Sequence, residues 1–231
     1  MARPLRVDFP GAIHHVGTRG NSDDAIVFDD HDRQKLVRLI AVVCDRYEMD
    51  CGGWCLMTNH YHLILRSRTG KLSRAMATLN GQFARWLNER YRRRGHRFGE
   101  RFFNRVLDHA GYRREVARYV PLNPVRAGMV DAPESWGWSS YAAQADLGPA
   151  LSFVSPFVVN EWFDGNTAAY RAWVLRMGST QSACLEALFE AHPRIDAIRA
   201  ALHPHQIPLD AVAEFLGTSV LALRSELRVT R

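Results

Sequence analysis

The chain has 231 residues, of which 47% are apolar and 23% charged, so it can bury a sizeable core and is not a disordered polar chain. Lysine and arginine together number 30 against 24 acidic residues, and because Lys35 and Lys71 are the only lysines, 28 of these cations are arginines, which favours bidentate contacts to phosphate. No apolar run approaches the roughly 20 residues that span a bilayer, and the N-terminus lacks the apolar stretch of a signal peptide. We therefore expect no membrane association and a cytoplasmic protein whose four cysteines are free thiols.

Apolar periodicity, capping residues and turn residues predict a mixture of strands and helices in the first half of the chain. In chain order, the predicted elements are a strand over 12–20, a helix over 29–46, strands over 51–57 and 60–66 with a tight connection between them, a helix over 72–91, a strand over 101–107 and a helix over 112–120. Adjacent antiparallel strands mixed with helices are typical of the α+β class.

The composition changes after Tyr141, which divides the chain into three predicted regions. We predict a principal domain over 1–145, a linker and helical connection over 146–182 and a helical region over 183–231. Residues 209–227 fit either a DNA-binding helix-turn-helix or an ordinary helical hairpin, and the pattern favours neither interpretation.

Most of the excess positive charge lies between Arg66 and Arg126. That segment holds 16 lysines and arginines against four acidic residues, a balance of +12 that leaves −6 for the rest of the chain. Its densest part is the stretch from Arg90 to Arg97, after which aromatic residues alternate with arginines. Such interleaving suits single-stranded nucleic acid, where arginines contact phosphates and rings stack on unpaired bases. The alternative is a solvated helix end whose aromatic side chains, Phe102 and Phe103 among them, turn into the core.

Two further features are candidates for chemistry. His60 and His62 are two residues apart on a predicted strand, so both imidazoles point to one face and can meet one metal ion, while Tyr61 points the other way. A satisfied core histidine is the alternative at each position. Near the end of the last predicted helix, Tyr119 and Asn123 are four residues apart, a spacing that places two side chains on one helical face. A packing tyrosine with a solvated hydroxyl is the alternative there.

Six short segments, in this order, carry a family likeness: GAIHHVGTRGN (11–21), WCLMTNHYHL (54–63), LNGQF (79–83), GHRF (95–98), RYVPLNPVRAG (118–128) and WSSY (138–141). Together they resemble the REP-associated tyrosine transposases, a branch of the single-tyrosine HUH transposases of bacterial insertion sequences. The likeness covers about residues 8 to 145 continuously.

The resemblance implies a ferredoxin-like antiparallel sheet with flanking helices, the HUH nuclease core. It implies that His60 and His62 hold a divalent cation, Mg²⁺ or Mn²⁺, that Asn123 completes the metal shell and that Tyr119 is the nucleophile. The implied reaction cleaves single-stranded DNA, with hairpin-forming repeats as the expected substrate, through a 5′-phosphotyrosine intermediate that can rejoin the strand to another end. Since a phenol is a poor nucleophile at its usual pKa near 10, metal and arginine charge are needed to favour its anion.

Ten arginines are the candidate DNA contacts: Arg92, Arg93, Arg94, Arg97, Arg101, Arg105, Arg113, Arg114, Arg118 and Arg126. Two positions depart from the pattern of the family. Pro121 disfavours helix at the residue before it, which predicts that Tyr119 and Asn123 do not share a face and weakens Asn123 as a ligand. His14 stands where an aromatic residue is commoner, and the sequence assigns it no role.

Three functions remain open at this stage. The first is an active, metal-dependent nuclease and strand-transferase, which the intact His60, His62 and Tyr119 favour. The second is a non-catalytic, domesticated protein that recognises repeat hairpins, and the third is an RNA-processing nuclease. The sequence leaves the choice between monomer and homodimer undecided.

Overall fold

The computed structural model describes residues 7–99, 101–108, 110–175 and 194–202. The chain divides into two units. The first comprises Met1–Asp108 with Val116–Val174, and the second comprises His109–Glu115 with Leu175–Arg231. Within the described ranges no helix is both long enough and apolar enough to cross a membrane.

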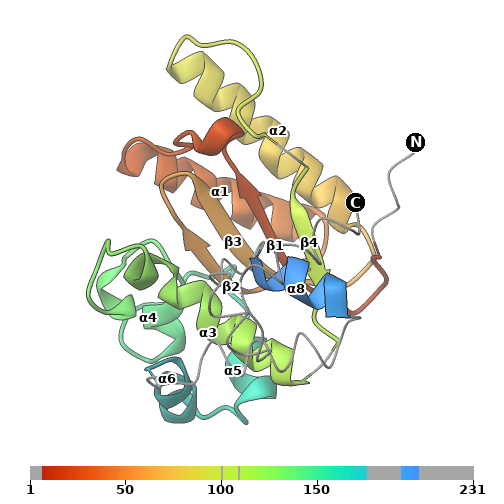
Figure 1. Cartoon of the computed structure of the whole chain (residues 1–231), viewed down its shortest axis with the longest axis vertical. Coiled ribbons are helices and arrows are strands. Elements are labelled where there is room, and N and C mark those ends of the chain that lie inside the picture. Colours follow the sequence, from red (N-terminus) through yellow and green to blue (C-terminus); the bar gives the residue numbers. More distant parts are fainter. Residues whose placement is uncertain (1–6, 100, 109, 176–193, 203–231) are drawn as a thin grey trace. The chain divides into compact units, whose positions relative to one another are not determined.

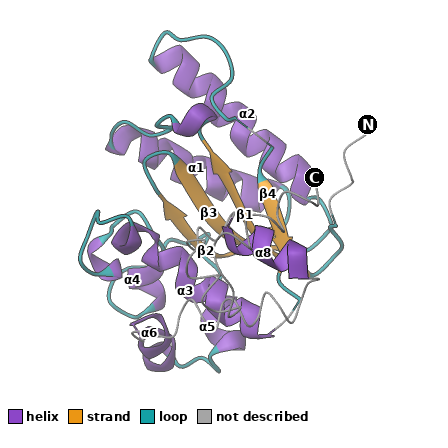
Figure 2. Cartoon of the chain, viewed as in Figure 1, coloured by secondary structure: helices purple, strands orange, loops and turns teal. Residues whose placement is uncertain are grey.

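The first unit is built on a four-stranded antiparallel sheet in the order β2-β3-β1-β4 (Figure 1). Its strands are β1 (Ala12–Arg19), β2 (Met49–Leu56), β3 (His60–Ser67) and β4 (Phe103–Val106). Helix α1 (Asp30–Arg46) connects β1 to β2, and α2 (Leu72–Arg90) connects β3 to β4 (Figure 2). This strand order confirms the α+β class and the ferredoxin-like sheet with flanking helices.

One face of the sheet is covered by α1 and α2 and holds the apolar core. Because side chains alternate along a strand, Val16 of β1 and Leu63 of β3 point to this face, where they pack with the buried stripes of both helices. Tyr61 lies on the same face and donates its hydroxyl to Asn80 of α2. The neighbouring residues along each strand, including His60 and His62 on either side of Tyr61, therefore point to the opposite face of the sheet.

An aspartate network fixes the start of α1. The side chain of Asp29 caps the helix by accepting the backbone N–H of Asp32 at 3.0 Å. The fully buried Asp32 carboxylate accepts the backbone N–H of Phe28 and the Tyr91 hydroxyl, both at 2.8 Å, and pairs with Arg90. The predicted start of this helix at residue 29 is confirmed, because Asp29 is its N-cap, and this network joins the start of α1 to the end of α2.

Helix α3 runs from Ala110 to Arg126 with two prolines inside it. A proline interrupts a helix because it cannot donate to the carbonyl four residues earlier. The hydroxyl of Tyr170 donates at 3.5 Å to Ala117, the carbonyl that Pro121 leaves without its usual donor. The Asn123 amide donates at 3.3 Å to Val120, the carbonyl that Pro124 leaves in the same way. The predicted end of this helix at Val120 is therefore wrong, because side chains replace both missing backbone donors.

Shorter helices complete the described part of the chain. The first unit contains η1 (Asn21–Asp23), η2 (Pro133–Ser135), α4 (Tyr141–Gln144) and α5 (Phe157–Trp162). It also contains α6 (Thr167–Leu175) except for the last residue of that helix. The second unit contains α8 (Arg194–Leu202). The candidate helix-turn-helix over 209–227 lies outside the described residues.

Replacing Asp32 by alanine should lower the free energy of unfolding by about 3 kcal/mol, because three donors lose a buried charged acceptor. The matched control is Asp30→Ala. The Asp30 carboxylate is 70% exposed and makes only an i,i+3 pair with Arg33, so its loss should cost less than about 0.5 kcal/mol. Chemical denaturation of both variants measures the difference, and equal midpoints would contradict this role of Asp32.

Candidate active site

The face of the sheet opposite α1 and α2 carries a row of three residues across three strands. His62 of β3 is paired with Gly17 of β1, and Gly17 is paired on its other side with Phe103 of β4. A Cβ atom at Gly17 would lie 2.2 Å from the Phe103 ring, so no larger residue fits there while that ring stays in place. The missing side chain leaves space above β1 in which rings from neighbouring strands meet.

The rings of His15, His62 and Tyr119 lie close together at this row. His15, two residues before Gly17, lies with its ring centroid 5.1 Å from that of His62, and their Nε2 and Nδ1 atoms are 3.2 Å apart. The ring of Tyr119 lies 5.4 Å from His62 and 5.8 Å from His15, edge-on to both. The structure therefore brings the predicted nucleophile beside one of the two predicted metal ligands.

His60 lies next to this group at the start of β3. Its ring centroid is 5.0 Å from that of His62, which confirms that the two imidazoles share a face. Nδ1 of His60 hydrogen-bonds with the side-chain oxygen of Asn59 at 2.7 Å, so Nδ1 carries the proton and Nε2 keeps its lone pair. That Nε2 is buried and has no hydrogen-bond partner among the described residues.

Burial also keeps His60 and His15 neutral. Desolvation lowers the pKa of His60 to about 4, with a smaller contribution from the charge of Arg19. Desolvation likewise lowers the pKa of His15 to about 3, with Arg105 adding to the shift. A histidine must be neutral to bind a metal, so both rings are in the state that ligation requires at neutral pH.

These observations fit a divalent cation held by the two motif histidines. The buried Nε2 of His60, with its lone pair, is the kind of atom that a metal satisfies. Among the described residues no three His, Cys, Asp or Glu side chains form a metal site, so a cation here would rely on these imidazoles and on other oxygen donors. Cys51 and Cys55 are free thiols and join no such cluster.

Asn123 lies on α3 one turn after Tyr119. Because the helix continues through Pro121, the prediction that this proline separates the two residues is wrong. The Asn123 amide donates to the Tyr119 and Val120 carbonyls at 2.9 and 3.3 Å. This bonding commits its nitrogen to the backbone, so as a metal ligand Asn123 would use its side-chain oxygen.

Arg126 and Arg105 lie beside this group, and the other candidate arginines of the first unit differ in exposure. The guanidinium of Arg126 lies 5.1 Å from the centroid of the Tyr119 ring, in cation–π geometry. Arg118 is buried, Arg105 is half-buried on β4 opposite His15, and Arg101 is exposed. Arg113 and Arg114 belong to the second unit.

The predicted basic stretch lies directly after α2. Arg92, Arg93 and Arg94 are exposed, and Arg93 lies over the ring of Phe28 at 5.7 Å. Arg97 is half-buried and donates to Asn88. Its backbone carbonyl accepts from Asn21, and the adjacent Gly20 donates to the carbonyl of Asn59. Short backbone contacts thus join the basic stretch to the residue that hydrogen-bonds with His60.

His14 has a role that the sequence leaves open. It lies on the core face of β1, and its two ring nitrogens bond with Asp8 at 3.1 Å and Asn104 at 2.9 Å. Asp8 also accepts the backbone N–H of Leu72 at the start of α2. His14 therefore ties three segments together and takes no part in the group around Tyr119.

Two residues of the site were missed from the sequence, His15 and Phe103. Phe103 lies edge-on to His15 at 4.9 Å and 5.7 Å from His62, whereas Phe102 is buried in the core. The available signal was the alternation of β1, which places His15 and Gly17 on one face, but it becomes informative only with the register to β3 and β4.

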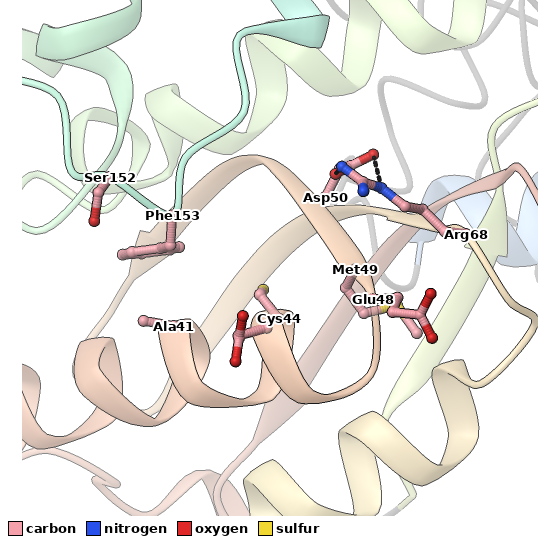
Figure 3. A pocket seen from close by; sticks show the side chains of 9 residues that line it. Ala41, Cys44, Glu48, Met49, Asp50, Arg68, Ser152 and Phe153 are labelled. Atoms are coloured by element: carbon pink, nitrogen blue, oxygen red, sulfur yellow. Dashed lines mark hydrogen bonds and ion pairs between the residues drawn. The ribbon is translucent and has the colours of Figure 1, made fainter.

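Two hollows lie elsewhere on the first unit. One, of about 550 Å³, is bordered by the acidic side chains of Glu48 and Asp50, and Asp50 pairs with Arg68 (Figure 3). Glu48 pairs with Lys71. The other, of about 480 Å³, is mostly apolar and is lined by Trp54, Trp136 and Trp138. Neither contains the histidines or Tyr119, and the acidic border of the first does not suit a polyanion.

Comparison with known proteins shows what part of this chain is similar to. Residues 14–122, a range that includes both motif histidines and Tyr119, match the family model described as "Transposase IS200 like". This part of the chain is similar to the IS200-like transposases. No curated protein matches its sequence.

Six solved chains are similar in structure to this protein. One is a REP-associated tyrosine transposase bound to a REP hairpin, which is 18% identical, with a TM-score of 0.55 over 67% of this chain and 94% of that one. The family model and the common fold together confirm the resemblance that the sequence motifs indicate.

Replacing Asn123 by aspartate tests what this residue does in helix α3. Aspartate keeps the shape but cannot donate to the two carbonyls, and its charge is unfavourable near the end of a helix. We expect the free energy of unfolding to fall by about 1–3 kcal/mol, measured by chemical denaturation. Unchanged stability would mean that Asn123 does not support the helix through its prolines.

Proposed function

We propose that this protein cleaves and rejoins single-stranded DNA through a covalent tyrosine intermediate, with hairpin-forming repeat DNA as its substrate. One observation carries the proposal: the Tyr119 ring lies 5.4 Å from His62 and beneath the guanidinium of Arg126. The proposed nucleophile, one proposed imidazole ligand and a cation thus lie together on one face of the sheet.

In this proposal Tyr119 attacks the scissile phosphorus in line. A bond forms between the phenolic oxygen and phosphorus while the bond from phosphorus to the 3′ oxygen breaks, so the 5′ side is held as phosphotyrosine. The phenolic proton passes to solvent and the departing 3′ oxygen takes up a proton. Rejoining reverses these steps with another 3′-OH, because the phosphotyrosine conserves the energy of the bond.

The site residues have distinct tasks. His60 and His62, with Asn123 as the further candidate, would hold a Mg²⁺ or Mn²⁺ ion. When bound, the ion polarises the scissile phosphate and stabilises its developing negative charge. Arg126 places a fixed positive charge next to the phenol, which favours its anion over the neutral form.

The DNA partner is supported by the basic stretch after α2. Exposed arginines at 92–94 and aromatic rings at Phe28 and Tyr91 lie together, since the two rings are 4.7 Å apart and Arg93 covers Phe28. We propose that phosphates follow these arginines, with Arg97, Arg101 and Arg105 continuing toward the site and Arg113, Arg114 and Arg118 flanking Tyr119 in sequence. The related transposase bound to a REP hairpin makes hairpin DNA the first substrate to test.

Replacing Tyr119 by phenylalanine should keep the ring contacts and DNA binding while abolishing the covalent adduct. The test incubates the protein with labelled single-stranded hairpin DNA and Mg²⁺ or Mn²⁺, then separates the products under denaturing conditions. Tyr112→Phe is the control and should retain the adduct.

An adduct that persists in Tyr119→Phe would reassign the nucleophile, with Tyr112 as the next candidate. If the wild-type protein binds the hairpin tightly but forms no adduct with any divalent ion, the non-catalytic alternative would hold.

Replacing Arg92, Arg93, Arg94 and Arg97 together by glutamine should weaken DNA binding about equally for all sequences. Each lost phosphate contact should flatten the slope of log affinity against log salt by about 0.7 for single strands, so four contacts remove about 2.8. The cleavage rate at saturating DNA should change much less.

The control for this variant removes the same charge elsewhere. Arg38, Arg46, Arg74 and Arg85 are exposed on α1 and α2, and their replacement by glutamine should leave the salt slope near the wild-type value. Equal slopes in the two fourfold variants would move the DNA path away from the basic stretch.

A further inference from the structure

The proposed function leaves one contact of the first unit unexplained, the hydrogen bond between His15 and His62. His15 Nε2 and His62 Nδ1 are 3.2 Å apart, and both residues are at least 97% buried. Their strands are paired so that Gly17 stands opposite His62, and this glycine leaves the two imidazoles room to meet across it. None of the proposed chemical steps requires His15, so its burial here needs a separate reason.

A hydrogen bond between two neutral imidazoles fixes both tautomers. If His15 donates, the proton of His62 is on Nε2, which then has no lone pair for a metal. If His62 donates from Nδ1, its lone pair is on Nε2. The two arrangements therefore differ in whether His62 can act as a ligand.

His60 provides the comparison within the same site. Its Nδ1 is bonded to Asn59, which leaves Nε2 as the nitrogen with the lone pair. Both motif histidines thus have Nδ1 committed to a neighbouring residue. A ligand whose other ring nitrogen is held by an acceptor is the usual arrangement in metal sites.

We propose that His15 is a positioning residue. Its Nε2 accepts a hydrogen bond from the Nδ1–H of His62, which keeps Nε2 of His62 unprotonated as the metal-binding nitrogen. The proposal rests on the proposed function, because it assumes that His62 is a ligand. His15 itself is held by the edge contact with Phe103 and by the ring of Tyr119, so it presents Nε2 in one orientation. It acts through His62 and touches neither DNA nor the ion.

Nitrogen-15 NMR of the metal-free, full-length protein tests the tautomer directly. We expect the Nδ1–H form of His62 in the wild type and in His15→Gln, whose side-chain oxygen is as many bonds from Cα as Nε2 of histidine. His15→Asn, whose amide reaches only as far as Nδ1, should lose this preference. An Nε2–H form of His62 in the wild type would overturn the proposal without the use of any variant.

Metal binding gives the second readout, with Mn²⁺ as the probe and calorimetry as the measurement. His15→Leu should bind Mn²⁺ about 10- to 100-fold more weakly than the wild type, while His15→Gln should stay close to it. His31→Gln, a change at an exposed histidine on α1, is the control and should not alter the affinity. Equal Mn²⁺ affinity of folded His15→Leu and wild type would refute the role of His15.

The variant His60→Ala/His62→Ala separates this inference from the proposed function. If the double variant loses Mn²⁺ binding and His15→Leu does not, only the role of His15 fails. If the double variant binds Mn²⁺ as well as the wild type does, the metal site itself is misplaced and the proposal for His15 falls with it.

Discussion

The candidate active site depends on a missing side chain at Gly17. A Cβ atom there would collide with Phe103 at 2.2 Å, and the glycine lies between His62 and Phe103 in the register of three strands. Because the position above β1 is empty, rings from β1, β3, β4 and α3 converge over it. The positions of the His15, His62 and Tyr119 rings therefore depend on the absence of a side chain at Gly17.

The two faces of the sheet differ in role: one stabilises the domain, and the other carries the candidate active site. Apolar side chains of β1 and β3 pack under α1 and α2 and supply the buried area that stabilises the domain. The opposite face buries imidazoles, which is unfavourable unless their nitrogens are bonded. The hydrogen bonds between His15 and His62 and between His60 and Asn59 satisfy one nitrogen of each ring and at the same time orient the rings.

Helix α3 continues through two prolines and carries the proposed nucleophile, Tyr119. Pro121 and Pro124 remove two backbone donors directly after Tyr119. Tyr170 of α6 and the side chain of Asn123 donate to the carbonyls left behind. The position of Tyr119 is therefore linked to a helix about fifty residues later, and Asn123 combines a structural task with its candidate role at a cation.

Local sequence patterns determined the strands and the two long helices packed on the sheet, and the part of the candidate site formed by His60 and His62. Periodicity and capping residues predicted α1, α2 and the four strands, and the spacing of His60 and His62 predicted their common face, because these features involve residues close together in the chain. Only the tertiary structure placed His15, Gly17 and Phe103 beside them, since strand register depends on pairing between distant segments. Only the tertiary structure carried α3 through Pro121, because the donor that replaces the missing N–H comes from Tyr170, and no local pattern encodes a hydrogen bond over that separation.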